Sequence, residues 1–141
     1  MTTHFSSPAI THETAARAVA LTMEAGERAG LRLVVTVADP AMAMVSFGRA
    51  DGATPHSAET SRRKAATAAS TRKPTAAMAA ELAIALEHGS GGLLTSIKGG
   101  VPLVFDGVHV GGLGVAGGRP DEDAAIAEEV LRALGADPVA G

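Results

Sequence analysis

The chain has 141 residues, about the length of one domain, with 12 Lys and Arg against 15 Asp and Glu and a net charge of −3. Nucleic-acid binding is not expected, because there is no long basic run, no Trp or Tyr, and only 3 Phe for stacking on bases. The lack of Cys excludes disulfides, thiolate metal sites and thiol nucleophiles. No apolar run approaches the roughly 18 residues of a membrane span and the first residues carry no signal-peptide core, so we expect a cytoplasmic protein without a membrane partner.

The first third of the sequence predicts a helix followed by a β-hairpin. Thr11 suits the N-cap of a helix whose apolar residues follow helical spacing until Gly30. Residues 31–38 then alternate as a strand does, Asp39 begins a turn with the following proline, and residues 42–48 return antiparallel.

The remaining sequence predicts two helices, a second hairpin and a last helix. Either Ser57 or Thr60 can cap an Ala-rich helix that runs to about Thr71, Pro74 interrupts it, and a further helix covers 75–88. Asp106-Gly107 is the dipeptide that a type I′ hairpin turn prefers, and a helix over 120–134 begins with a proline and three acids. This order predicts a single α+β domain, residues 1–141, with helices packed on an antiparallel sheet.

Six short motifs along the chain together form a specific signature. They are Arg49-Ala50-Asp51-Gly52-Ala53, Lys64-Ala65-Ala66-Thr67-Ala68, Gly99-Gly100-Val101-Pro102-Leu103, Asp106-Gly107, Gly111 to Gly118 and Glu122-Asp123. This signature resembles that of the GlcG/HbpS family of haem-binding-like proteins, which also occurs as the C-terminal domain of PduO-type proteins. The resemblance covers about residues 12–135, with short flexible termini on either side. It implies a profilin-like or PAS-like layout with four to five strands, a homo-oligomer between dimer and octamer, and a small-molecule ligand, with haem as the cofactor it suggests.

The chain departs from the family pattern in the first hairpin turn. Where the family has Asp-x-x-Gly, this sequence has Asp39-Pro40-Ala41-Met42. We therefore expect a different turn geometry at this point.

The glycines near the second hairpin are candidate ligand-binding residues. Gly112 and Gly114 weaken a strand unless a ligand or another subunit approaches its backbone closely. The alternative is that they only relieve a twisted or bulged sheet. The same family signature adds Gly99, Gly100 and Pro102 to the candidate ligand-binding set.

Arg49 and Lys64 are candidate binders of an anionic group. Arg49 follows a strand and Lys64 lies on the helix just after it, so both could converge on a carboxylate or a haem propionate. The alternative is a solvated Arg49 and a surface Lys64 whose stem covers apolar residues.

The candidate catalytic residues are Asp123, Glu122 and His109. Glu122 and Asp123 could serve as acid and base, or could orient Lys64 or Arg49 across a cleft. Alternatively they stabilise the start of a helix by about 0.3 to 1 kcal/mol each. Asp51 is better suited to forming a turn with Gly52 than to a functional role, because the side chain of an Asp-Gly pair readily bonds its own backbone.

No metal site is predicted from the five histidines, because none shows the i, i+4 pairing of a helical site. His109, after the second hairpin turn, and His56, at the start of a helix, could each ligate haem iron or transfer a proton. The alternative for each is a surface or structural histidine.

Three functions therefore remain open from the sequence. The first is an oligomeric small-molecule-binding protein that holds haem or another planar or carboxylated ligand. The second is a cofactor-independent lyase, isomerase or cyclase acting by acid–base chemistry on a small organic acid or aldehyde, with glycine backbone N–H groups stabilising an oxyanion. The third is an assembly subunit without a ligand.

Overall fold

The computed structural model describes residues 1–140. Within them the chain forms four helices and four strands in the order that the sequence predicts. These are α1 (His12–Ala29), β1 (Val34–Ala38), β2 (Met44–Arg49), α2 (Ser57–Thr71), α3 (Ala80–Gly89), β3 (Gly100–Phe105), β4 (Val108–Ala116) and α4 (Pro120–Leu134).

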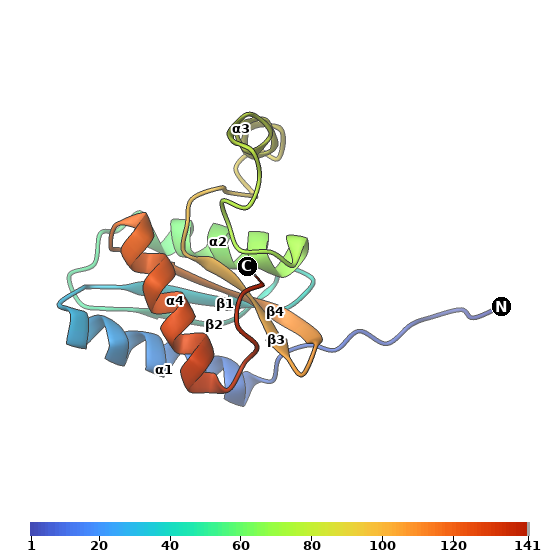
Figure 1. Cartoon of the computed structure of the whole chain (residues 1–141), viewed down its shortest axis with the longest axis horizontal. Coiled ribbons are helices and arrows are strands. Elements are labelled where there is room, and N and C mark those ends of the chain that lie inside the picture. The colour runs from blue at the N-terminus through green and yellow to red at the C-terminus, as the bar shows by residue number, and fades with distance from the viewer. Residues whose placement is uncertain (141) are drawn as a thin grey trace.

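The four strands form one antiparallel sheet in the order β2-β1-β4-β3. Helices α1 and α4 cover one face of this sheet, and α2 runs across the other face (Figure 1). The α+β fold with helices packed on an antiparallel sheet is therefore confirmed, with both faces of the sheet covered. Helix α3 stands apart from these layers (Figure 1).

The hydrophobic core lies between the sheet and the α1–α4 pair. It consists of aliphatic side chains and alanines because the sequence offers so few aromatic residues. Central strand β1 is buried along its whole length. The other face of the sheet has only a small cluster of Ala38, Ala65 and Ala69, so α2 lies very close to the strands.

Most of the predicted element ends are confirmed. The Thr11 side chain accepts a hydrogen bond from the Thr14 amide and caps α1, which ends at Gly30 in the left-handed conformation. Asp106 and Gly107 both have positive φ, 50° and 79°, as a type I′ turn requires.

The first hairpin turn closes with a methionine in a conformation that suits glycine. Met42 has φ of 69°, and the Asp39 carboxylate accepts hydrogen bonds from the amides of Ala41 and Ala43. The departure from the family motif therefore leaves Met42 in the left-handed region, which costs a non-glycine residue roughly 1–2 kcal/mol.

The prediction of a helix over 75–88 is wrong at its start, because α3 begins only at Ala80. Thr75 is bonded to β3 instead. Its amide donates to the Gly100 carbonyl, and its hydroxyl accepts from the Gly100 amide, both at 3.0 Å. Ala76 then takes a positive φ of 70°, so the segment before α3 serves the sheet edge. None of the helices within residues 1–140 is long and apolar enough to cross a membrane.

Candidate functional site

Gly112 and Gly114 face helix α2 of the same chain. A Cβ on Gly112 would lie 2.6 Å from the Ala69 nitrogen, and one on Gly114 would lie 2.5 Å from the Ala65 nitrogen. The predicted close approach to these glycines is thus made by a helix backbone within the subunit. Their space is filled in this structure by α2, where the sequence led us to expect a ligand or a second subunit.

Lys64 lies in the protein interior, with 1% of its surface exposed. Its Nζ donates to the Val115 carbonyl at 2.8 Å and to Asp123 Oδ2 at 3.1 Å. The other oxygen of Asp123 accepts from the Gly118 amide at 2.9 Å. Of the roles that the sequence left open for Asp123, the structure shows a contact with Lys64, as a buried ion pair joining α2, β4 and α4 and not across an open cleft.

Burial dominates the electrostatics of this pair. Desolvation lowers the pKa of Lys64, and the attraction of Asp123 opposes this shift. Desolvation likewise raises the pKa of Asp123, against the charge of Lys64 and the hydrogen bonds that its carboxylate accepts. Each charge thus depends on the other to remain ionised inside the protein.

Gly99 and Gly100 let the start of β3 lie against this pair. Gly99 has φ of 127°, and a Cβ there would lie 2.7 Å from Lys64 Nζ. A Cβ on Gly100 would meet the Lys64 backbone and the Thr75 side chain. The two glycines therefore act in packing around Lys64, while Pro102 lies buried further along the same strand.

Glu122 caps the helix on which it lies. Its carboxylate accepts a hydrogen bond from the Arg119 amide at 2.8 Å, which completes the capping box of α4. This contact matches the structural alternative for Glu122. Asp123, next to it, has both carboxylate oxygens engaged in the interior.

His109 lies at the other end of β4 from the buried pair. Six residues separate it from Val115, or about 20 Å along a strand, so the structure does not bring His109 together with Asp123 as one acid–base site. Its Nε2 is 2.8 Å from the Ala69 carbonyl, so this nitrogen carries the proton. Its Nδ1 is buried without a hydrogen-bond partner among the described residues.

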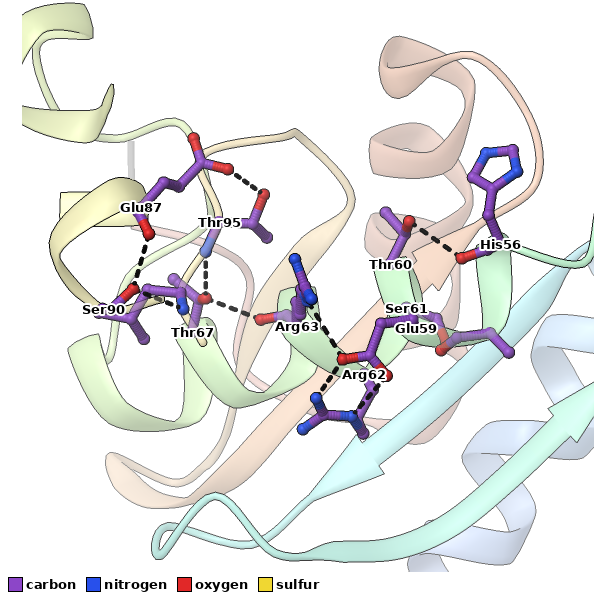
Figure 2. A network of polar contacts seen from close by, with 12 residues as sticks. His56, Glu59, Thr60, Ser61, Arg62, Arg63, Thr67, Glu87, Ser90 and Thr95 are labelled. Atoms are coloured by element: carbon purple, nitrogen blue, oxygen red, sulfur yellow. Dashed lines mark hydrogen bonds and ion pairs between the residues drawn. The ribbon is translucent and has the colours of Figure 1, made fainter. Parts of the chain in front are cut away.

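Arg49 and His56 are both exposed, and neither side chain contacts the buried pair. Arg49 ends edge strand β2, away from the interior position of Lys64. His56 precedes α2 without a side-chain cap, and its imidazole makes none of the drawn contacts (Figure 2). Asp51 lies in a turn closed by a hydrogen bond from the Ala53 amide to the Ala50 carbonyl, as its predicted turn-forming role requires.

Helix α3 and the segments on either side of it form an arm, residues 73–98, that is fixed to the body by polar contacts. The Glu87 carboxylate accepts hydrogen bonds from Thr95 Oγ1 at 3.0 Å and Ser96 Oγ at 2.7 Å. The Thr95 amide donates to Thr67 Oγ1 of α2 (Figure 2). Figure 2 also shows the exposed pairs of Glu59 with Arg62 and Arg63 on α2. The crevice under the arm holds only about 30 Å³, room for about one or two waters.

A larger groove follows the outer edge of β3. It has a volume of about 670 Å³, which is within the range of small-molecule sites. It lies between the end of α2 and the C-terminal segment that follows α4. The residues that line it are Arg72, Lys73, Pro74, Ala77, Pro102, Val104, Asp137, Pro138, Val139 and Ala140.

The groove combines apolar walls with two cations. Arg72 and Lys73 are exposed at the C-terminal end of α2, and within residues 1–140 neither side chain has an ion-pair partner. Asp137 keeps its negative charge and accepts hydrogen bonds from the amides of Asp106 and Gly107, so the two cations of the groove outnumber its one anion. The groove therefore suits an apolar molecule with one or more carboxylates.

Sequence reasoning included only Pro102 of this groove. Arg72 and Lys73 lie between a predicted helix and Pro74, and no sequence pattern connects them to Pro102. The C-terminal segment has no motif at all. A groove made by three segments distant in sequence has no local signal by which it could have been found.

The sequence matches the family model described as haem degrading protein HbpS-like over residues 10–132. The chain therefore belongs to the HbpS-like family. None of the curated proteins matches it significantly.

Solved structures show the same fold. HbpS of Streptomyces reticuli is 34% identical, with 94% of this chain and 91% of that chain covered and a TM-score of 0.84. The PduOC–haem complex is 23% identical, covers 94% and 99% of the two chains, and has a TM-score of 0.85. Protein ORFY of Klebsiella pneumoniae is also 23% identical, with 95% and 96% covered and a TM-score of 0.85. The two structures at 23% identity support the fold alone.

Proposed function

We propose that this protein binds a planar, carboxylated small molecule of the porphyrin type in the groove at the β3 edge. The observation that carries the proposal is the pairing of apolar walls with Arg72 and Lys73 at one end of the groove. An extended ring would lie on the accessible apolar residues Val104, Ala77 and Pro138, and its carboxylates would contact the two cations. The family membership supports haem as the first ligand to test.

The groove fits the ring and propionates of haem better than it fits the iron. None of the described residues lining it is His, Met, Cys or Tyr, the side chains that usually ligate haem iron. The Nε2 of His109 is engaged by a helix carbonyl and its Nδ1 is buried. We therefore expect affinity to come from the ring and its carboxylates, with little contribution from iron ligation. When bound, haem would supply redox chemistry at its iron.

The test is a spectroscopic titration of the purified protein with haemin and, separately, with metal-free protoporphyrin. We expect saturable binding of both, with affinities within a few-fold of each other. The double variant Arg72→Ala/Lys73→Ala should bind both ligands about tenfold more weakly, or weaker still. The reason is that each charge-assisted contact contributes about 1.5–3 kcal/mol when desolvated and less when exposed.

The matched control is Arg62→Ala/Arg63→Ala, which removes two cations elsewhere on α2. This variant should keep its affinity. Binding of haemin that disappears in His109→Ala or His56→Ala, with no binding of metal-free protoporphyrin, would overturn the proposal in favour of iron ligation by histidine.

We also propose that the protein acts as a homo-oligomer. Large apolar side chains are exposed on two separate surfaces, the arm and strand β2. On the arm, Leu82 and Ile84 are 60% and 67% exposed. On β2, Met44 and Phe47 are 56% and 41% exposed. Large exposed apolar side chains of this kind favour an interaction surface. A size between dimer and octamer is expected from the family resemblance, and a mass measurement in solution tests it.

A further inference from the structure

The two edges of the sheet differ in how their backbone is protected. At the β3 edge, three successive outward positions are closed. Thr75 bonds both the amide and the carbonyl of Gly100, Pro102 has no amide proton, and the Asp137 amide donates to the Val104 carbonyl at 2.8 Å. Protection of this kind prevents another strand from pairing there.

The β2 edge is open within the described residues. The Ala50 amide donates to the Leu33 carbonyl, so the backbone groups of Ala50 point inward, toward β1. In the β1–β2 register, residues of β2 whose backbone groups point inward alternate with residues whose groups point outward, away from the sheet. Phe47 and Arg49 are in the outward set, opposite Thr36 and Val34. Their amides and carbonyls therefore point away from the sheet without a partner in residues 1–140.

The side chain of Phe47 is exposed because helix α2 does not cover strand β2. Its neighbour Thr36 faces α2, where its hydroxyl contacts Ser61 at 2.8 Å. Phe47 is thus on the α2 side of the sheet, but α2 lies over β1, β4 and β3 and scarcely reaches β2. An open strand edge and an uncovered aromatic side chain coincide at one residue.

We propose that β2 pairs antiparallel with β2 of a second copy of this chain, about a two-fold axis at Phe47, to give a continuous eight-stranded sheet. The second copy is the occupant that the edges favour. Because the β3 edge is closed, β2 cannot pair with β3 of another copy in an open chain, and β2–β2 pairing is self-complementary and ends at two subunits.

Repulsion between the two copies of Arg49 favours one position of the two-fold axis over its neighbours. Pairing centred on Phe47 separates the two Arg49 residues by four strand positions, about 13 Å, beyond the screening length of about 8 Å at physiological salt. An axis one residue further, at Gly48, would bring them to about 7 Å. An axis at Ser46 would include the bulge between the β1 partners Val37 and Ala38.

This interface is a specific contact within the homo-oligomer proposed above. It does not depend on ligand binding, because the groove lies at the opposite edge of the sheet. The chain has no Cys, so a single introduced cysteine reports contacts cleanly. We expect Phe47→Cys to oxidise rapidly to a disulfide-linked dimer, since residues opposite each other at a two-fold axis approach about 5.5 Å between Cα atoms. Arg49→Cys on the same strand is the control and should not cross-link, since its copies lie beyond the roughly 7 Å limit.

The second measurement is the mass in solution of the full chain and of Phe47→Glu, which would place two carboxylates opposite each other. We expect the mass of the variant to fall at least to half that of the wild type, with an unchanged circular dichroism spectrum. A monomeric wild type would overturn both the oligomer and this interface. An oligomeric wild type with equal cross-linking of the two cysteine variants and unchanged mass of Phe47→Glu would overturn the interface alone and leave the arm as the contact.

Discussion

Lys64 shows how far one residue can depart from what its local sequence indicates. It follows Arg62 and Arg63, and the run of three charges is typical of an exposed helix face. In the structure the two arginines pair with Glu59 at the surface, while Lys64 turns inward to Asp123. The sequence could pick out Lys64 and Asp123 as important, but neither periodicity nor spacing shows that they contact each other inside the protein.

We predict that this pair determines stability. Lys64→Met and Asp123→Leu should each lower the free energy of unfolding by about 3–5 kcal/mol, because each leaves the partner charge buried and unpaired. The double variant should be much closer to wild type than the sum of the two. Chemical denaturation of the four proteins measures this coupling.

The control for that cycle is the exposed pair of Lys98 and Asp121, whose side chains are 54% and 85% exposed. Lys98→Met should change stability only slightly, as exposed ion pairs contribute little. If Lys64→Met were as mild as Lys98→Met, the buried pair would not determine stability and this prediction would be wrong.

At the scale of elements, the glycines of β4 determine the distance between helix and sheet. From the sequence we expected a ligand or another subunit at Gly112 and Gly114, or else relief of a twisted sheet, whereas in the structure the group next to both glycines is α2. Nothing in a single sequence distinguishes a neighbouring helix from a ligand, because both leave the same signature of missing side chains.

We predict that Gly114→Ala lowers the free energy of unfolding by about 1–3 kcal/mol or more through overpacking. The added Cβ would collide with the Ser61 carbonyl and the Ala65 nitrogen. Gly89→Ala, where nothing lies within 4 Å, should instead be neutral or stabilising by up to about 1 kcal/mol. Thermal denaturation of both variants checks this, and equal effects would contradict the packing explanation.

The arm is a second element whose stability has a definite source. Its ten-residue helix is too short to be stable alone, and hydrogen bonds from Ser96 and Thr95 lower the pKa of Glu87 below its ordinary 4.5. A lowered pKa means that the carboxylate stabilises the folded arm fully above pH 4.5 and that this contribution disappears as the pH falls towards the lowered value.

We predict that Glu87→Gln accelerates amide hydrogen exchange over residues 80–97 about fivefold at neutral pH, the equivalent of roughly 1 kcal/mol between a charged and a neutral acceptor. Wild-type exchange, corrected for intrinsic rates, should approach that of the variant below pH 4.5. Glu81→Gln on the same helix is the control. Equal effects of the two substitutions would show that Glu87 does not fix the arm.

At the scale of the whole molecule, the sequence predicted the α+β class and the element order because hydrophobic periodicity, caps and turn residues act over a few neighbours. It missed the position of the groove, the exposure of the β2 edge and the early residues of the arm. Each of these depends on strand order, and strand order is set by contacts between residues far apart in the chain. The family resemblance supplied the fold but not these surfaces.

The central claim is that the ligand groove lies at the β3 edge while the glycine-rich strand serves internal packing. Hydrogen exchange of the full chain with and without protoporphyrin tests it most directly. We predict slower exchange over residues 73–78 and 137–140, which flank the groove, with no change in β4 or the middle of α2. Protection confined to residues 108–116, or to the segment around Arg49, would contradict it.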